Sequence, residues 1–309
     1  MPDFTALQQE LRRLAEERDA VILAHNYQRP EVQDAADYTG DSLELARLAA
    51  RDPHSVILFC GVHFMAETAA ILSPQKRVLM PDKTAGCPMA DMVTVAGLRA
   101  LKAQHPDAVV VAYVNTSAAV KAEADVCCTS ANAVAVVERF PKEQKIIFVP
   151  DRNLGGYVAR ATGREETMIL WQGWCHVHDD FRAADVERAR AEHPDAVVLA
   201  HPECRQEVLD LADVVASTSG MLRYPEQSPA RTFVVFTEAA LLHPLQKRYP
   251  DRRFVAGSRG AICPNMKKTT LERCVATLGE EWDDAAAHEV TVPPTVRERA
   301  LAAVERMIA

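Results

Sequence analysis

Short apolar runs alternate along the chain with segments whose apolar residues recur every three or four positions. The runs at 21–23, 55–60 and 77–80 are almost entirely apolar, which is typical of strands buried on both faces of a sheet. The segments 42–50 and 65–72 between them have helical spacing. Because strands and helices alternate, the pattern predicts an α/β fold with parallel sheets.

The same pattern occurs three times along the chain. Three similar segments, 19–24, 107–112 and 195–200, all begin Asp-Ala-Val and follow one another at a step of 88 residues. Three further sets of residues keep this step: Asp37, Asp125 and Asp213; Ser42, Ser130 and Thr218; and Cys87, Cys175 and Cys263. Several landmarks in one register indicate three homologous units.

The units are expected to span residues 19–106, 107–194 and 195–282, followed by a C-terminal helical extension over 283–309. A helix over residues 6–18 resembles the helices that end each unit, so we expect it to pack on either the first unit or the third. We expect three parallel-sheet α/β sandwich units related by a pseudo-threefold axis. A linear string of units is the alternative arrangement.

Ligands bind open parallel sheets at the carboxyl ends of the strands, where loops and helix N-termini converge. The residues of interest at these ends are His25, Tyr27, Ser42 and Cys87 in the first unit, Tyr113, Val114, Asn115, Ser130, Cys175 and His178 in the second, and His201, Pro202, Glu203, Thr218 and Cys263 in the third. If the units close around an axis, their loops surround one cavity.

The repeated cysteines Cys87, Cys175 and Cys263 are candidate metal ligands. Three thiolates on a pseudo-threefold axis suit a [4Fe–4S] cluster in which three irons each take one cysteine and the fourth stays open. An open iron is a Lewis acid that can hold a hydroxyl or carboxylate oxygen. A zinc ion with three thiolates is the other metal hypothesis, and packing in the core is the non-metal one. The strict register favours a metal over packing.

Other candidate residues suggest an anionic substrate and proton transfer. Ser42, Ser130 and Thr218 stand where a strand turns into a helix, so we expect N-cap hydroxyls there. Three helix N-termini facing one cavity would also offer amides to carboxylate or phosphate groups. We expect Glu203 to act as a general acid or base, with Tyr113 as a proton donor and His178 as a third participant.

Composition narrows the choice of partners and compartment. The 309 residues carry a formal net charge of -8 and no run of basic residues, so nucleic acid is not an expected partner. The N-terminal segment lacks the apolar core of a signal peptide and no stretch is long enough to cross a bilayer, so we expect no membrane partner and a cytoplasmic location. The cysteines outside the register are expected to pack in the core: Cys60, Cys127, Cys128, Cys204 and Cys274.

Motifs at these positions resemble those of quinolinate synthase, the iron–sulfur enzyme family of de novo NAD biosynthesis. The resemblance extends through most of the chain, including Ala-His-Asn-Tyr-Gln at 24–28, Gly-Cys-Pro-Met-Ala-Asp at 86–91 and Cys-Pro-Asn-Met-Lys-Lys at 263–268. It implies condensation of iminoaspartate with dihydroxyacetone phosphate to give quinolinate, phosphate and water. It also implies a [4Fe–4S] cluster held by Cys87, Cys175 and Cys263.

The resemblance further implies roles for the residues around the cluster. Those matching family positions that contact the imino acid are His25, Ser42, Tyr113, Val114, Asn115, Ser130, His201, Pro202, Glu203 and Thr218. Tyr27, Glu203 and His178 match positions implicated in proton transfer. The aspartate-oxidising enzyme that makes the imino acid is a candidate transient partner. Some family members have extra cysteines where Gly257 and Gly260 stand here, so no thiol–disulfide switch is expected.

Two other functions remain open from the sequence. One is a different enzyme with an open-iron cluster held by three cysteines, such as a dehydratase or the reductive dehydroxylase of isoprenoid synthesis. The other is a non-catalytic binding protein with a metal-stabilised core, which would have no need of Tyr113, Glu203 and His178 around the metal.

Overall fold

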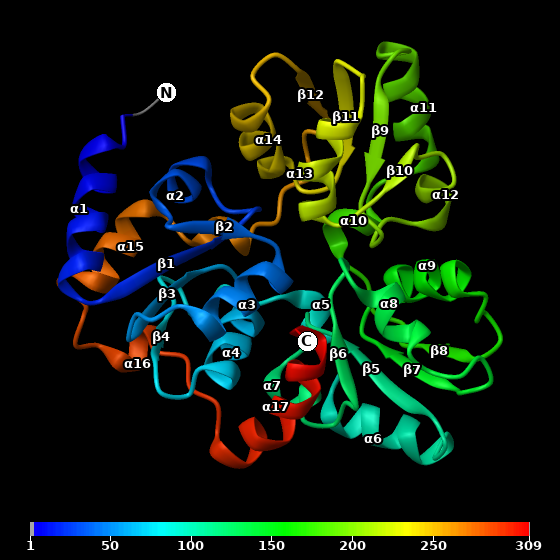
Figure 1. The fold of residues 1–309 in the computed structure, drawn as a ribbon, viewed down its shortest axis with the longest axis horizontal. Helices are drawn as coiled ribbons and strands as arrows, with labels where there is room; N and C mark the ends of the chain where they lie inside the picture. The colour runs from blue at the N-terminus through cyan, green and yellow to red at the C-terminus, as the bar shows by residue number, and fades with distance from the viewer. Residues whose placement is uncertain (1–2, 309) are drawn as a thin grey trace.

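The computed structural model, which describes residues 3–308, contains three four-stranded sheets of parallel strands arranged around a common centre (Figure 1). The strand orders are β2-β1-β3-β4, β6-β5-β7-β8 and β10-β9-β11-β12, so one topology is used three times. This confirms the predicted α/β fold of three homologous units.

The bounds of the elements follow the repeat. The first sheet and its connections comprise β1 (Ala20–His25), α2 (Pro30–Ala35), β2 (Tyr38–Gly40), α3 (Ser42–Arg51), β3 (Val56–Cys60), α4 (His63–Leu72), β4 (Arg77–Leu79), α5 (Pro88–Asp91) and α6 (Val95–Gln104). The second comprise β5 (Val109–Tyr113), α7 (Ala118–Lys121), β6 (Val126–Cys128), α8 (Ala133–Glu138), β7 (Ile146–Val149), α9 (Arg152–Thr162), β8 (Met168–Leu170), α10 (His176–Asp179) and α11 (Ala183–Glu192). The third comprise β9 (Val197–Ala200), α12 (Gln206–Leu209), β10 (Val214–Val215), α13 (Thr218–Gln227), β11 (Thr232–Phe236), the short 3-10 helix η1 (Ala239–Leu241), α14 (Leu242–Arg248), β12 (Arg253–Ala256), η2 (Met266–Lys268) and α15 (Leu271–Leu278). Outside the repeat lie α1 (Thr5–Glu17), α16 (Ala285–His288) and α17 (Pro294–Ile308).

The repeated aspartates Asp37, Asp125 and Asp213 have a structural role at the start of each second strand. The carboxylates of Asp37, Asp125 and Asp213 accept the backbone N–H of Ile22, Val110 and Val198 at 2.7, 2.8 and 2.7 Å, respectively. The backbone N–H of each aspartate also donates to the carbonyl of the first-strand residue that its side chain contacts, Ile22, Val110 or Val198, at 3.0 Å. The carboxylate therefore extends the hydrogen bonding between the first and second strands by one residue before the second strand, and it fixes the point at which the second strand begins.

The helix that ends each unit in sequence packs on the sheet of the next unit. Figure 1 places α6 beside β5, and Val186 and Ala189 of α11 share a core with Val198 of β9. By the same rule α15 returns to the first sheet, where Leu271 and Leu278 are buried in one core with α1 and β1. The first sheet thus carries both α1 and α15, and this return closes the ring of three units.

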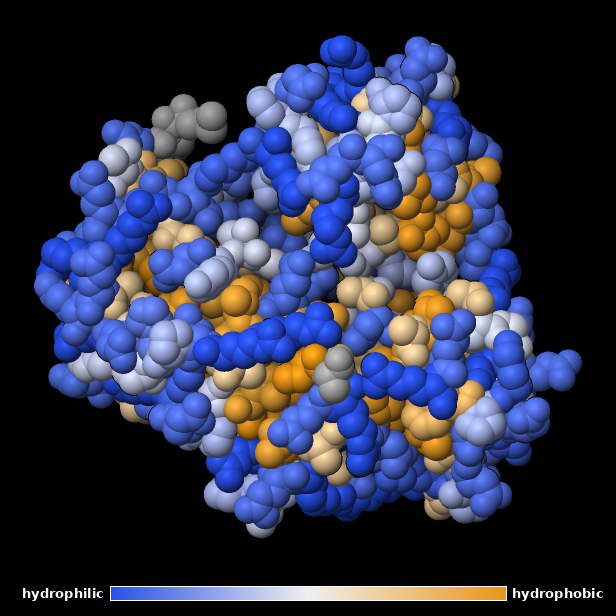
Figure 2. Space-filling model, in the orientation of Figure 1, coloured by the Kyte–Doolittle hydropathy of each residue, from blue (hydrophilic) through white to orange (hydrophobic). Residues whose placement is uncertain are grey.

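The C-terminal helix α17 joins the first two units. It packs against α3 and α4 on one side and α7 and β6 on the other. Its final turn accepts a hydrogen bond from Asn132 Nδ2 to the Met307 carbonyl at 2.9 Å. Figure 2 shows that hydrophilic side chains cover most of this face, with apolar side chains visible between the elements around α17.

The five cysteines outside the repeat register are all buried in the hydrophobic cores, as predicted for packing residues. Among residues 3–308, no helix has both the length and the apolar character needed to cross a membrane.

Candidate active site

A cavity of about 770 Å³, including its open mouth, lies where the carboxyl ends of the three sheets meet. The predicted site residues that line it are His25, Tyr27, Ser42, Cys87, Tyr113, Asn115, Ser130, Cys175, His178, His201, Glu203, Thr218 and Cys263. Val114 and Pro202 are buried and do not line the cavity. The structure therefore brings together residues from all three units that are up to 238 positions apart in the chain.

The three register cysteines approach the cavity on equivalent loops. Cys87 and Cys175 immediately precede the short helices α5 and α10, and Cys263 precedes η2. Burial raises the pKa of the Cys87 thiol to about 12. A bound metal would have to displace that proton, because the thiolate is the ligand. Three thiols from three loops, in a cavity wall that contains no lysine or arginine among the described residues, form a donor set that fits an iron–sulfur cluster.

Buried carboxylates hold two of these cysteine loops through their backbone. Asp151 Oδ2 accepts the Cys175 N–H at 3.2 Å, and Glu238 Oε1 accepts the Cys263 N–H at 3.1 Å. Both carboxylates follow the third strand of their unit, at its carboxyl end. They fix the direction in which the next side chain, the cysteine thiol, leaves the loop.

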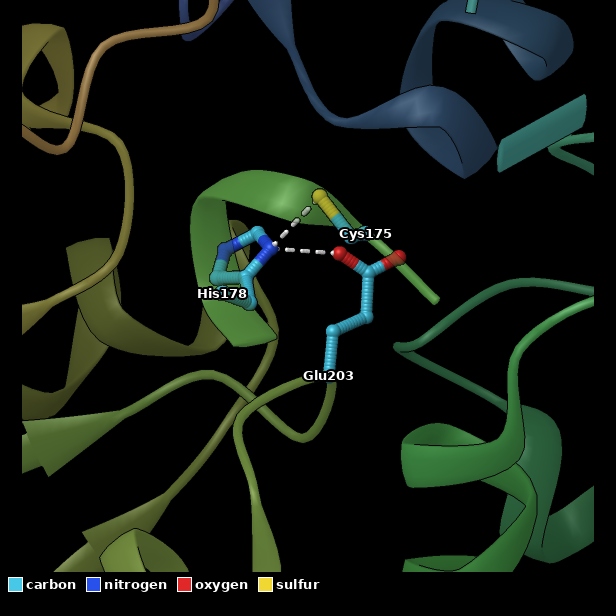
Figure 3. A group of neighbouring side chains, drawn as sticks. All are labelled: Cys175, His178 and Glu203. Atoms are coloured by element: carbon cyan, nitrogen blue, oxygen red, sulfur yellow. Dashed lines mark hydrogen bonds and ion pairs between the residues drawn. The ribbon is translucent and has the colours of Figure 1, made fainter. Parts of the chain in front are cut away.

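Four side chains form a row of short polar contacts across the cavity wall. Glu203 Oε2 lies 2.7 Å from His178 Nδ1, and His178 Nε2 lies 2.8 Å from Thr237 Oγ1. Thr237 Oγ1 in turn lies 2.6 Å from the Tyr27 hydroxyl. Figure 3 shows that His178 Nδ1 faces both Glu203 and Cys175, whose Sγ is 3.2 Å from that nitrogen. The row connects a carboxylate to a phenol through an imidazole and a hydroxyl.

The same atoms allow a second interpretation of the metal site. Ligand atoms of Cys175, His178 and Glu203 all lie within 4.8 Å of one another, which is a spacing compatible with a single metal ion. Such an ion would occupy the position of the Glu203–His178 contact and leave Cys87 and Cys263 without a role. We therefore favour the donor set of three cysteines.

Electrostatics separates proton acceptors from donors in the cavity. Burial would raise the pKa of Glu203, but the charge of His178 and its hydrogen bond to the carboxylate outweigh burial and hold the pKa below its usual value. Burial and the charge of Glu203 raise the pKa of both Tyr27 and Tyr113 well above the usual value. Glu203 is thus ionised, while the two phenols keep their protons at neutral pH.

Two histidines at equivalent register positions are neutral. Burial, and then the charge of Lys267, lower the pKa of His25 to about 3. Burial, and then the charge of His178, lower the pKa of His201 to about 3. Their Nδ1 atoms accept the N–H of the residue two positions on, at 3.1 Å for His25 and 3.3 Å for His201. The proton of each neutral ring therefore lies on Nε2, where it can be donated to a bound ligand.

The predicted N-cap roles of Ser42 and Thr218 are wrong by one residue. Asp41 caps α3 by accepting the N–H of Leu43 and Glu44 at 3.0 Å each, and Ser217 caps α13. Ser42 and Thr218 are the first residues of α3 and α13, whereas Ser130 lies outside α8, which begins after Asn132. The physical reason is that Asp41 and Ser217 have extended backbone just before the first turn, so their side chains reach the free N–H groups of that turn. The predicted hydroxyls are left to line the cavity instead.

The sequence did not reveal Thr237 and Glu238, which follow β11. The strand pairing aligns them with Gly61 and Val62 in the first unit and with Pro150 and Asp151 in the second, so no residue type recurs in all three units, although Asp151 and Glu238 are both acidic. A weaker signal was present, since a polar pair directly after a buried apolar strand lies at the ligand-binding edge of a sheet. Glu238 lines the cavity, and further lining residues that were not predicted include Asp41, Phe64, Met65, Thr129 and Met266.

Comparison with known proteins identifies close relatives of the whole chain. A family model described as quinolinate synthetase A protein matches residues 9–309. The quinolinate synthase of Desulforudis audaxviator (strain MP104C) is 53% identical over 300 residues, covering 97% of each chain. That of Methanoregula boonei (strain DSM 21154 / JCM 14090 / 6A8) is 54% identical over 311 residues, covering 100% of each chain. A third, from Geobacter metallireducens (strain ATCC 53774 / DSM 7210 / GS-15), is 52% identical over 303 residues, covering 98% of this chain and 97% of the relative.

Proposed function

The chain belongs to the quinolinate synthetase A family, and from that premise we propose that it condenses iminoaspartate with dihydroxyacetone phosphate to give quinolinate, phosphate and water. The observation that carries the proposal is the single cavity in which residues of all three units meet. It combines three thiols, a row of proton-handling groups and neutral hydrogen-bond donors, which the reaction needs together.

Cys87, Cys175 and Cys263 are the residues that would hold a [4Fe–4S] cluster, each binding one iron and leaving the fourth without a protein ligand. When bound, the cluster supplies a Lewis acid for a substrate hydroxyl or carboxylate oxygen. The carboxylates of Asp151 and Glu238 orient two of the three ligand loops, in the manner of supporting contacts at other metal sites.

The anionic substrates are held by neutral donors rather than by a basic surface. His25 and His201 each present an Nε2–H, and Ser42, Ser130 and Thr218 add hydroxyls beside the first turns of the helices. Amides and hydroxyls at helix N-termini favour carboxylate and phosphate groups. Asn115 Oδ1 is buried and, among the residues of the described chain, has no hydrogen-bond partner, so it is available to a donor on the substrate, such as an imine or amine N–H.

Proton transfer falls to Glu203, His178 and the two tyrosines. Forming the carbon–carbon bond and losing water require a proton to leave the imino acid and other protons to reach departing oxygens. Glu203 is ionised and can accept a proton, either directly or through His178 at 2.7 Å. Tyr27 and Tyr113 are protonated and can donate. Thr237 connects Tyr27 with His178, so a proton lost at one end can be replaced from the other.

An assay under oxygen-free conditions tests the proposal. Protein containing iron is mixed with freshly generated iminoaspartate and dihydroxyacetone phosphate, and quinolinate is measured. Cys175→Ala should lose both iron and product, whereas Cys274→Ala, which removes a buried thiol outside the cavity, should keep both. Iron-loaded protein that makes no quinolinate would exclude this function. Protein that binds zinc or no metal would favour a binding role.

A further inference from the structure

Glu238 is a second completely buried carboxylate in the cavity wall, distinct from the row that contains Glu203. Its Oε1 accepts the Cys263 N–H at 3.1 Å and lies 2.8 Å from Lys267 Nζ. Its Oε2 accepts the Ala240 N–H at 2.9 Å. Burying a carboxylate is unfavourable unless a cation and hydrogen bonds compensate it, so Lys267 accounts for the charge that Glu238 brings into the wall.

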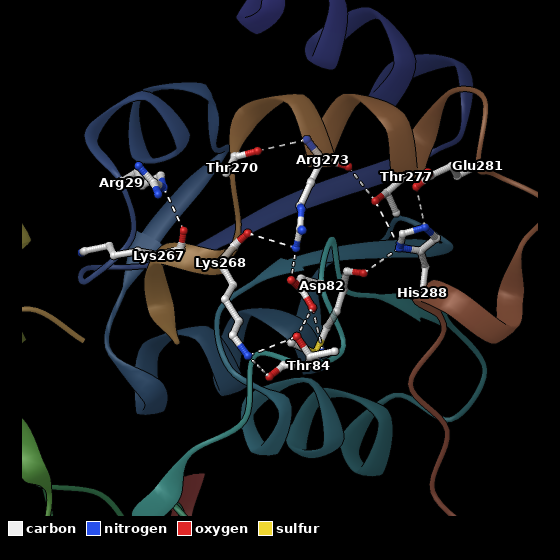
Figure 4. A network of polar contacts seen from close by, with 11 residues as sticks. Arg29, Asp82, Thr84, Lys267, Lys268, Thr270, Arg273, Thr277, Glu281 and His288 are labelled. Atoms are coloured by element: carbon white, nitrogen blue, oxygen red, sulfur yellow. Dashed lines mark hydrogen bonds and ion pairs between the residues drawn. The ribbon is translucent and has the colours of Figure 1, made fainter. Parts of the chain in front are cut away.

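Lys267 also connects the third unit to the first. Besides Glu238, its ammonium donates to the backbone carbonyl of Tyr27, in the loop that presents Tyr27 to the cavity. The Lys267 carbonyl accepts a hydrogen bond from Arg29 Nε at 2.9 Å. Figure 4 shows this contact together with the neighbouring Lys268. Lys268 Nζ donates to the Thr84 carbonyl at 2.7 Å, in the segment that leads to Cys87.

Glu238 and Lys267 lie between the third unit and the first, and this position explains why a buried ion pair supports the Cys263 loop. Asp151 supports Cys175 in the same way that Glu238 supports Cys263, but its other contacts are the Asn153 and Leu154 amides that begin α9. No lysine lies among these described contacts of Asp151. The junction of Lys267 with Tyr27 joins segments 240 residues apart, where the ring closes and no short chain connection holds the two loops together.

We propose that the buried Glu238–Lys267 ion pair is a positioning device that fixes the Cys263 loop against the Tyr27 loop. Retention of iron at Cys263 and placement of Tyr27 then depend on the same two side chains. The inference rests on the proposed function, because it takes Cys263 as a ligand of the cluster. It gives a role to Glu238 and Lys267, which belong neither to the repeated landmarks nor to the row of polar contacts from Glu203 to Tyr27.

The test measures iron release from oxygen-free protein to a ferrous chelator, together with KM for iminoaspartate and kcat. Lys267→Met leaves Glu238 buried and uncompensated, so iron should leave about tenfold faster or more, and KM should rise as the Tyr27 loop shifts. Glu238→Gln should also speed release. The double variant, which buries no charge, should release iron more slowly than Lys267→Met alone, because the two effects are not additive within a pair.

Two controls separate this pair from general weakening of the interface. Lys247→Met removes a lysine at the same junction, 2.6 Å from Asp34 but 68% exposed, and should release iron at the wild-type rate. Lys267→Arg keeps the charge and should stay closer to wild type than Lys267→Met. The inference is overturned if Lys267→Met behaves like Lys247→Met, or if the double variant shows the sum of the single effects. Wild-type protein without iron would instead overturn the proposed function.

Discussion

Replacing Thr237 with valine removes one hydroxyl and keeps the shape of the side chain. In the wild-type protein that hydroxyl lies 2.6 Å from the Tyr27 hydroxyl and 2.8 Å from His178 Nε2. All three side chains are buried, so water cannot readily take its place. The substitution therefore interrupts the row between Tyr27 and Glu203 without touching either end.

The size of the effect follows from the two contacts that are lost. A buried polar group left without its partner costs about 1–3 kcal/mol, and about 1.4 kcal/mol corresponds to a tenfold change in rate. Positioned proton transfer itself contributes about 10²–10⁴-fold to a reaction. We therefore expect kcat of Thr237→Val to fall by about 100-fold or more. Iron content should not change, because Thr237 contacts none of the three register cysteines through a hydrogen bond among the described residues.

The assay measures the rate of quinolinate formation at saturating substrate, with iron content determined on the same sample. Thr277→Val is the matched control, because Thr277 is also buried and its hydroxyl lies 3.3 Å from His288 Nδ1, outside the cavity (Figure 4). It should lose stability and keep kcat. A Thr237→Val protein with full iron and a kcat within about threefold of wild type would refute the row as a proton path.

Three further predictions concern the acid–base group, the repeat and the metal. Glu203→Gln should retain iron and lose about 100-fold or more in kcat, since an amide cannot take the proton, and full turnover would contradict the acid–base role. Asp125→Ala should lower the free energy of unfolding by about 1–2 kcal/mol, because the Val110 N–H loses its acceptor, whereas Asp210→Ala, at an exposed ion pair, should change it by less than about 0.5 kcal/mol in a denaturant titration. Chelation of iron should abolish quinolinate formation, and reconstitution with iron and sulfide should restore it; recovery with zinc alone would contradict a cluster.

The fold could be predicted because each unit repeats the same local chemistry. The Asp37, Asp125 and Asp213 carboxylates bond to the first strand in each copy, so the landmark in the sequence is also a contact in the structure. The sheet on which a helix packs was harder to predict. The helices α1 and α15 have similar patterns, and only the path of the chain around the ring brings both to the first sheet.

The site was predictable where its residues share the register and lie at strand ends. Ser42 and Thr218 were found in this way, although the caps themselves are Asp41 and Ser217, because the cap is the polar residue that keeps extended backbone just before the first turn. Thr237 could not be found from the repeat. Its partners Tyr27 and His178 come from other units, and their approach depends on tertiary packing between sheets.

The central claim is that thiols from three units hold one iron–sulfur cluster. The most direct measurement is anomalous diffraction at the iron absorption edge from crystals grown without oxygen. We predict anomalous density for iron in the cavity, bonded to the sulfurs of Cys87, Cys175 and Cys263. A single metal peak between Cys175, His178 and Glu203, or iron density that leaves any of the three cysteines unbound, would contradict the account.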